Sequence, residues 1–303
     1  MNVIMFSGQG AQKVGMGKDF YENFVVSRQT FEEASDAMGM DMAKLCFEDA
    51  DGLLAQTQFA QPALVTSGIA AYRAILQEGI SGDMLMGLSL GEYTALVAAN
   101  VLDFAQTVKL VHRRGLLMTE LAAPGGMMAV MGLGRDVVEE ICARASCAGF
   151  VACANFNTPE QIVISGEKAA LDACAPLIKE AKGKAIALKV SGSFHTKLMQ
   201  RAADAFVAEM LGIVPKAATL PIISNVTADV LDADDLTAHL GRHMTSSVFW
   251  ADSVVKAKEL GGRRFIELGC GNTLVNFVKK IDGTLETLAL EGLDQLKLVK
   301  NVG

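Results

Sequence analysis

The chain has 303 residues, 51% hydrophobic and 20% charged, with a formal net charge of −7. This composition can fill a large hydrophobic core, in one large domain or two smaller ones, and it excludes a globally disordered chain. The acidic balance argues against nucleic-acid binding as the main task. No hydrophobic run reaches the roughly 20 residues that a membrane-spanning helix needs, and the first residues do not resemble a signal peptide.

The six cysteines lack the C-x-x-C spacing of a zinc site, and a disulfide framework is not expected. We expect most of them to be small buried residues of a cytoplasmic protein.

The first strand is predicted at residues 1–6. It is followed by the loop Ser7-Gly8-Gln9-Gly10-Ala11-Gln12, whose glycines permit a sharp turn close to a ligand. The spacing matches neither a P-loop nor a dinucleotide-binding loop, so the loop alone could be an ordinary connection. Helices are then predicted at residues 28–38, ended by Gly39, and at residues 62–78, with Pro62 in the first turn.

A serine lies between two glycines in the stretch Gly87-Leu88-Ser89-Leu90-Gly91-Glu92, after a short hydrophobic strand and before a helix at residues 93–99. This is the nucleophile-elbow pattern, in which small neighbours let the serine project. The Leu90 amide starts the helix and lacks an intrahelical acceptor, so it can donate to an oxyanion. The strand–turn–helix context favours a catalytic Ser89 over a chance match in a chain with 29 glycines.

An arginine lies inside the hydrophobic stripe of the next predicted helix, residues 104–121. The helix opens at Asp103 with a capping-box-like Gln106, and the stripe consists of Leu110, Val111, Leu117, Met118 and Leu121. Arg114 on this buried face needs a partner. That partner is either an internal Asp or Glu, or a ligand carboxylate held by two parallel N–H···O bonds, and the helix leaves both open.

The element order changes after Gly125. Strands are predicted at residues 127–131, 150–154, 161–165 and 184–190, and helices at residues 135–145 and 167–181, with a kink or break at Pro176. This β-α-β-β-α-β order is the ferredoxin-like unit, and we infer a small subdomain at residues 126–190.

The main chain resumes with Ser191-Gly192-Ser193-Phe194-His195-Thr196. A helix is predicted to residue 210, a strand at 221–224, a helix at 250–260, a strand at 265–268, a turn with a further helix, and a strand at 284–288. Strands that alternate with helices predict a largely parallel sheet covered on both faces. Residues 1–125 and 191–303 therefore form one predicted α/β core.

A serine nucleophile needs a base within hydrogen-bond reach. We predict that His112, and His239 with His243 on one polar helix, lie at the surface. His195 begins a helix after a loop of small residues and is the best candidate base. No acid between Ser89 and His195 stands out, so the imidazole is oriented by an acid from elsewhere or by a backbone carbonyl.

Several separated motifs resemble the malonyl-CoA:acyl-carrier-protein transacylases over nearly the whole chain. They are the loop at residues 7–12, the stretch at 87–92, Arg114-Gly115, Ser193-Phe194-His195-Thr196 and Gly269-Cys270-Gly271. The resemblance implies an α/β-hydrolase-like core with a ferredoxin-like insert. It also implies transfer of a malonyl group from malonyl-CoA to the phosphopantetheine thiol of acyl carrier protein, without metal, other cofactor, nucleic acid or membrane.

The resemblance also implies roles for particular residues. They are Ser89 as nucleophile, His195 as base, the amides of Gln9 and Leu90 as oxyanion hole, Arg114 as ligand of the malonyl carboxylate, Leu88, Met118 and Phe194 as acyl-pocket residues, and the Ser246 backbone as the group that orients His195. The family usually has histidine where this chain has Leu88, and often asparagine where it has Ser246. Phe194 is similar to malonyl-selective members, in which its bulk hinders an α-methyl group.

Two other functions remain open. A serine esterase or thioesterase would share Ser89 and His195 but would have no need for Arg114. A non-catalytic carrier-docking protein would keep the fold and the docking surface without turnover.

The carrier is expected to be acidic, so a positive surface near the site is expected too. Its candidates are Lys184, Lys189, Lys197 and Arg201, which could equally be scattered solubilising charges. Whether the carrier serves fatty-acid or polyketide synthesis stays open.

Overall fold

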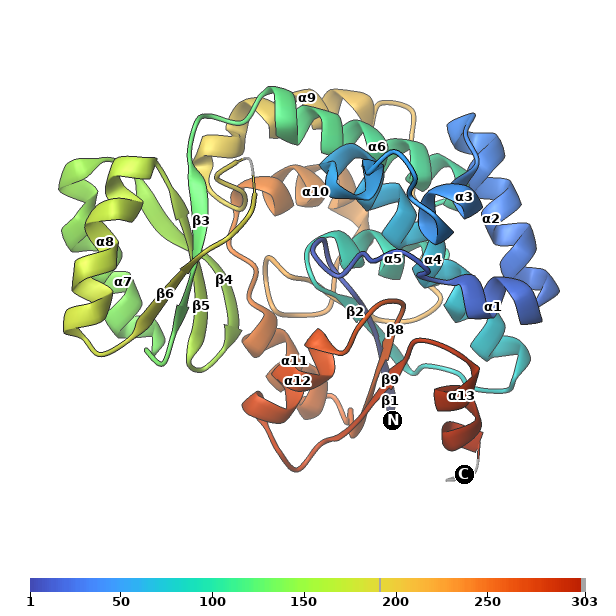
Figure 1. Cartoon of the computed structure of the whole chain (residues 1–303). Helices are drawn as coiled ribbons and strands as arrows, with labels where there is room; N and C mark the ends of the chain where they lie inside the picture. Colours follow the sequence, from blue (N-terminus) through green and yellow to red (C-terminus); the bar gives the residue numbers. More distant parts are fainter. Residues whose placement is uncertain (191, 301–303) are drawn as a thin grey trace.

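The structure is a computed structural model that describes residues 1–190 and 192–300. Two sheets organise it (Figure 1), one of five strands and one of four. Ser191, where the core was predicted to resume, lies outside the described residues. The predicted division into a core at 1–125 and 191–303 and a subdomain at 126–190 therefore remains a proposal.

The five-stranded sheet is parallel throughout. It contains β1 (Asn2–Phe6), β2 (Met84–Gly87), β7 (Ile222–Ile223), β8 (Arg264–Leu268) and β9 (Glu286–Leu290), in the order β7-β2-β1-β8-β9. Parallel strands are joined by crossover helices, which bury both faces of the sheet. The prediction of a largely parallel α/β sheet is confirmed.

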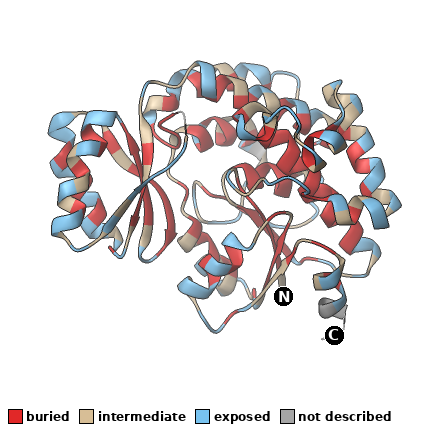
Figure 2. Ribbon diagram, viewed as in Figure 1, coloured by how far each residue is buried: buried red, intermediate tan, exposed pale blue. Residues whose placement is uncertain are grey.

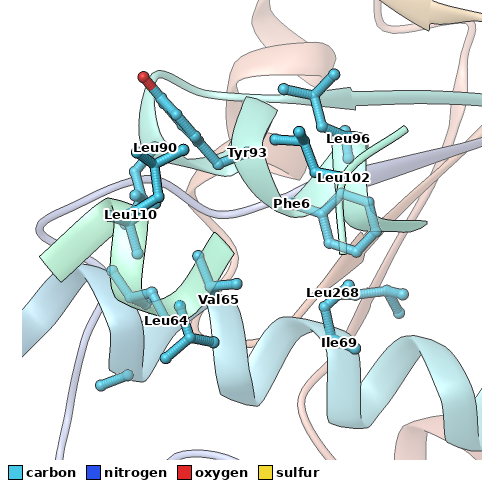
Figure 3. Packing of buried hydrophobic residues seen from close by; sticks show 14 of the residues in the cluster. Phe6, Leu64, Val65, Ile69, Leu90, Tyr93, Leu96, Leu102, Leu110 and Leu268 are labelled. Carbon is cyan, nitrogen blue, oxygen red and sulfur yellow. The ribbon is translucent and has the colours of Figure 1, made fainter. Parts of the chain in front are cut away.

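Side chains of β1 alternate between two hydrophobic layers, because successive residues of a strand face opposite sides. Ile4 and Phe6 join the larger core, in which Figure 3 shows Phe6 beside Leu268 and the helices. Val3 and Met5 join the second core on the other face. The buried residues in Figure 2 therefore run through the centre of the sheet.

Most helices pack into the larger core. They are α1 (Lys18–Asn23), α2 (Val25–Met38), α3 (Met42–Phe47), α4 (Thr57–Gln77), α5 (Leu90–Ala98), α6 (Phe104–Glu120), α9 (Gln200–Glu209) and α10 (Leu236–Thr245), with the 3₁₀ turns η1 (Leu53–Ala55), η3 (Lys197–Met199) and η4 (Ala233–Asp235). Helix α13 (Leu293–Lys300), which follows β9, also packs into the larger core through Leu293 and Leu296, whereas α11 (Trp250–Glu259) and α12 (Thr273–Ile281) cover the other face. Sequence analysis did not predict α1, α3 or α13.

The four-stranded sheet has the predicted ferredoxin-like arrangement. Its elements are β3 (Gly126–Met131), α7 (Arg135–Ala145), η2 (Ser146–Ala148), β4 (Val151–Thr158), β5 (Gln161–Gly166), α8 (Lys168–Glu180) and β6 (Lys184–Ala187). The strands are antiparallel in the order β4-β5-β3-β6. Helices α7 and α8 pack on one face, while Met127, Ala129 and Val163 on the other face join the larger core.

The edge of β4 is bonded to the chain between α10 and α11. The Val248 amide donates to the Ala154 carbonyl at 2.8 Å, and the Phe156 amide donates to the Val248 carbonyl at 2.9 Å. This short backbone pairing ties the four-stranded sheet to the segment that follows α10.

Prolines lie inside two helices, and the prediction for Pro62 was wrong. Helix α4 begins at Thr57, so Pro62 lies inside it and not in its first turn. A proline there cannot donate to the Gln58 carbonyl, and the His112 ring supplies the contact instead, with Nδ1 at 2.7 Å from that oxygen. His112 is thus half-buried and not a surface residue. Helix α8 likewise continues through Pro176 without a break.

All six cysteines are free thiols, and five are buried, as predicted for most of them. Among the described residues, no helix combines the length and the hydrophobicity needed to cross a membrane.

Candidate active site

The Ser89 turn has the geometry of a nucleophile elbow. Leu88 and Ser89 alone connect β2 to α5. Ser89 has φ 50° and ψ −106°, a conformation that is strained for a residue with a side chain. Close approach of backbone requires the two glycines. A Cβ on Gly87 would lie 2.0 Å from the Gly91 carbonyl carbon, and one on Gly91 would lie 2.1 Å from the Phe6 oxygen.

His195 lies against Ser89, with 2.8 Å between His195 Nε2 and Ser89 Oγ. The two residues come from segments 106 positions apart. His195 also has a positive φ, 59°, and is buried. A nitrogen with a free lone pair at this distance can accept the serine proton, which is the arrangement that a serine nucleophile needs.

A backbone carbonyl orients the imidazole. His195 Nδ1 lies 3.1 Å from the His243 oxygen, so Nδ1 carries the proton and Nε2 remains the acceptor toward Ser89. Burial and the charge of Arg114 lower the pKa of His195 to about 4, although the main chains of His243 and Ser246 raise it. The prediction named Ser246, which contributes in this way, but the described hydrogen bond goes to His243.

Arg114 is buried, and none of the described ion pairs includes it. Its NH1 donates to the Gln61 side-chain oxygen at 2.9 Å, and the guanidinium lies 5.1 Å from the centre of the Tyr93 ring. Burial raises the pKa of Tyr93 to about 12, so this phenol does not neutralise the arginine. Nε and NH2 have no hydrogen-bond partner among the described residues, which contradicts the alternative of an internal ion pair.

A short relay of side chains joins Arg114 to the loop after β1. The Gln61 amide donates to Gln9 Oε1 at 3.3 Å, and the Gln9 amide donates to Thr57 Oγ1 at 3.2 Å. The relay fixes the side chain of Gln9. No hydrogen bond from the backbone amides of Gln9 and Leu90 appears among those of the described residues, so both remain available as oxyanion donors. Their role stays a prediction.

These residues line a cleft of about 380 Å³ between the two sheets. Ser89, His195, Arg114, Gln9, Leu88, Met118 and Phe194 all contribute to its wall. Leu90 and Ser246, which were predicted to act through their main chains, are not among the lining residues. The roles of individual wall residues remain predictions.

The four-stranded sheet adds wall residues that sequence analysis missed. Asn155 and Asn157 of β4 line the cleft, and Asn157 Oδ1 is buried without a hydrogen-bond partner among the described residues. The strand predicted here ended at residue 154, whereas β4 continues to Thr158 and carries both amides into the site. The register of β4 shifts between Cys153 and Asn155 and again between Phe156 and Thr158, so alternation in the sequence did not reveal them.

A polar network behind the elbow was also missed. His239 and His243 are buried, so the prediction that they lie at the surface was wrong. His239 Nε2 lies 2.5 Å from Glu92 Oε1, and Glu92 Oε2 accepts the Asn225 amide at 2.6 Å. The usable signal was Glu92 itself, since an acid in the hydrophobic first turn of α5 requires a buried partner.

The parallel sheet and the serine elbow are features of α/β enzymes that act through a serine nucleophile. A model of the acyl transferase domain family matches residues 3–287, and the chain belongs to this family.

A malonyl CoA-acyl carrier protein transacylase from Bacillus subtilis strain 168 is 38% identical over 300 residues, which are 97% of this chain and 95% of that protein. A solved structure of the Clostridium perfringens malonyl CoA-acyl carrier protein transacylase superposes with a TM-score of 0.97 at 40% identity, covering 99% and 96% of the two chains. A malonyl-transacylase solved in complex with a type II PKS acyl-carrier protein has a TM-score of 0.95 at 34% identity, covering 100% of this chain and 99% of that one.

Proposed function

We propose that this protein transfers a malonyl group from malonyl-CoA to the phosphopantetheine thiol of an acyl carrier protein. The observation that carries the proposal is the pairing of two features in one cleft. Ser89 and His195 supply a serine nucleophile with its base, and Arg114 offers a carboxylate its Nε and NH2, which have no partner among the described residues. The related transacylases, which bear this activity in their names, support it.

In the first half-reaction, Ser89 Oγ attacks the thioester carbonyl carbon while His195 Nε2 takes the hydroxyl proton. The amides of Gln9 and Leu90 donate to the oxygen that becomes negative. Collapse of the tetrahedral intermediate breaks the carbon–sulfur bond, and His195 returns the proton to the leaving CoA sulfur. The product is a malonyl ester of Ser89.

In the second half-reaction, the carrier thiol occupies the position that CoA has left. His195 takes the thiol proton, the sulfur attacks the ester, and the proton returns to Ser89 Oγ as the malonyl group leaves. Both half-reactions balance with these residues alone, so we propose that no metal ion or cofactor takes part. We also propose a cytoplasmic location, which suits free cysteine thiols.

Intact mass spectrometry tests this function. Incubation with malonyl-CoA should add one malonyl group to the wild type and none to a Ser89→Ala variant, and addition of carrier should remove the adduct and malonylate the carrier. Rapid release of free malonate without carrier would indicate a thioesterase instead. The absence of any adduct would indicate a non-catalytic docking protein.

A further inference from the structure

A chain of hydrogen bonds begins at the main chain of the nucleophile. The Ser89 amide donates to Asn225 Oδ1 at 2.7 Å, and the Asn225 side-chain amide donates to the Gly87 carbonyl at 2.7 Å. The Asn225 backbone amide in turn donates to Glu92 Oε2 at 2.6 Å. The Asn225 side chain thus bonds directly to the elbow, and its backbone bonds to the carboxylate of Glu92, which is fully buried.

The other oxygen of that carboxylate continues the chain to α10. Glu92 Oε1 lies 2.5 Å from His239 Nε2. One turn further along α10, the His243 carbonyl lies 3.1 Å from His195 Nδ1. His195 Nε2 closes the ring at 2.8 Å from Ser89 Oγ.

The Glu92–His239 contact is the part of this ring that holds α10 to α5. The His243 ring nitrogens have no hydrogen-bond partner among the described residues, and His243 Nε2 is 3.7 Å from Glu92. Among the described side-chain hydrogen bonds, that of Glu92 with His239 is the one that joins the two helices. If the Glu92–His239 hydrogen bond is lost, no other described side-chain hydrogen bond between α5 and α10 fixes the His243 carbonyl relative to Ser89.

We propose that Glu92 and His239 are positioning residues for acyl transfer, which set the approach of His195 to Ser89 by holding α10 against the elbow. Neither residue lines the cleft, so neither contacts substrate. The proposal rests on the proposed function, and it concerns the geometry of the base and not the identity of the acyl group. Small displacements of a catalytic group slow a reaction strongly, because the reacting atoms must meet within a narrow range of distance and angle.

Two amide variants of His239 test whether the side chain must be long enough to contact Glu92 or need only be polar. In His239→Gln the side-chain amide can occupy the place of Nε2 and donate to Glu92, whereas the shorter amide of His239→Asn cannot. We expect His239→Asn to lower kcat for malonyl transfer by about ten- to a hundredfold with the KM for malonyl-CoA within about twofold, and His239→Gln to stay within about threefold of wild type.

The matched control is Ser27→Ala, which removes a buried hydrogen bond between α2 and α4 that lies outside the ring. We expect it to lower the melting temperature and leave kcat unchanged. Equal kcat for wild type and His239→Asn, with a lowered melting temperature, would reduce His239 to a structural role and overturn the proposal. Equal losses of kcat in both His239 variants would also overturn the proposal, because contact of the side chain with Glu92 would then make no difference.

Two further measurements test the proposal even if malonyl-CoA is not the substrate or if a variant does not fold. The rate at which a small fluorophosphonate labels Ser89 needs the base but no malonyl recognition, so it tests the positioning even if malonyl-CoA proves not to be the substrate. If His239→Asn does not fold, Glu92→Asp replaces it, since this change keeps the carboxylate but shortens its reach to His239. Wild-type labelling and turnover in that variant would equally overturn the proposal.

Discussion

At the scale of the residue, we propose that Arg114 separates malonyl transfer from other acyl transfers. Its Nε and NH2 are buried and unpaired among the described residues. An Arg114→Ala variant should therefore lose malonyl acylation of Ser89 steeply, because the free carboxylate would enter the cleft without a partner. Acetyl-CoA carries no such carboxylate, so acetyl acylation should fall little or rise. Rapid-quench measurement of both acylation rates provides the comparison.

The control for this prediction is Arg114→Lys. An ammonium group cannot reproduce a planar two-point contact, so it should rescue malonyl acylation poorly while restoring the charge. Melting temperatures of both variants report general damage. Parallel losses for the malonyl and acetyl groups would remove Arg114 from carboxylate recognition.

A second prediction at this scale concerns pH. A general base works in its neutral form, and the pKa of His195 is lowered to about 4 by burial and by Arg114. Acylation should thus keep its rate as the pH falls from 7 to 5, instead of declining near pH 6.5 as an ordinary histidine would require. Pre-steady-state acylation across this range, with circular dichroism to verify folding, measures it. A decline centred near pH 6.5 would contradict the low pKa.

At the scale of the element, the loop after β1 is held to the end of β8 by Glu267. Glu267 Oε2 accepts the Val275 amide at 3.0 Å, and Ser7 Oγ lies 3.2 Å from Glu267 Oε1 and 3.0 Å from the Cys270 carbonyl. One hydroxyl proton cannot serve both acceptors. A protonated Glu267 resolves this, because it can donate to Ser7 while Ser7 donates to Cys270.

Glu267→Gln tests this arrangement through stability. Burial raises the pKa of Glu267 from 4.5 to about 7, so the folded state binds more protons than the unfolded state between these values. The wild type therefore loses stability as the pH rises through this range, and the glutamine variant does not. Relative to wild type, the variant should gain up to about 3 kcal/mol between pH 5 and pH 8 in urea unfolding. A constant difference between the two proteins would contradict a protonated Glu267.

Element types were predictable from hydrophobic runs and helical periodicity, and element ends were not. The continuous hydrophobic run of β1 and the order of strands and helices sufficed for both sheets. The start of α4 was missed because proline was expected in the first turn of a helix. Pro62 instead lies inside α4, where His112 contacts the Gln58 carbonyl that proline leaves without a donor. Ser89, His195 and Arg114 could be found from local patterns, whereas His239 looked like a surface residue until its buried partner, Glu92, was known.

At the scale of the whole molecule, four exposed basic residues are the candidates for binding an acidic partner. Lys184, Lys189, Lys197 and Arg201 are exposed, and none of the described ion pairs includes them. Lys189 also lines the cleft. We propose that the carrier docks through this surface and that malonyl-CoA does not. Charge reversal at Lys189 should then raise the KM for an acidic carrier and spare acylation by malonyl-CoA.

Lys44→Glu is the control for that measurement. Lys44 is exposed on α3, which Figure 1 places on the opposite side of the molecule from β6. The control should leave both half-reactions unchanged. Equal effects of Lys189→Glu on both half-reactions would refute a role in docking.

The pairing of Val248 with β4 makes opening of the cleft visible to amide hydrogen exchange. The amides of Val248 and Phe156 are bonded across the boundary between the sheets, while that of Ile164 lies inside the smaller sheet. A bonded amide exchanges with solvent only when its bond opens. Faster exchange at Val248 and Phe156 than at Ile164 would mean that the sheets part as intact bodies. Equal rates would mean that the cleft opens only when the smaller sheet itself unfolds.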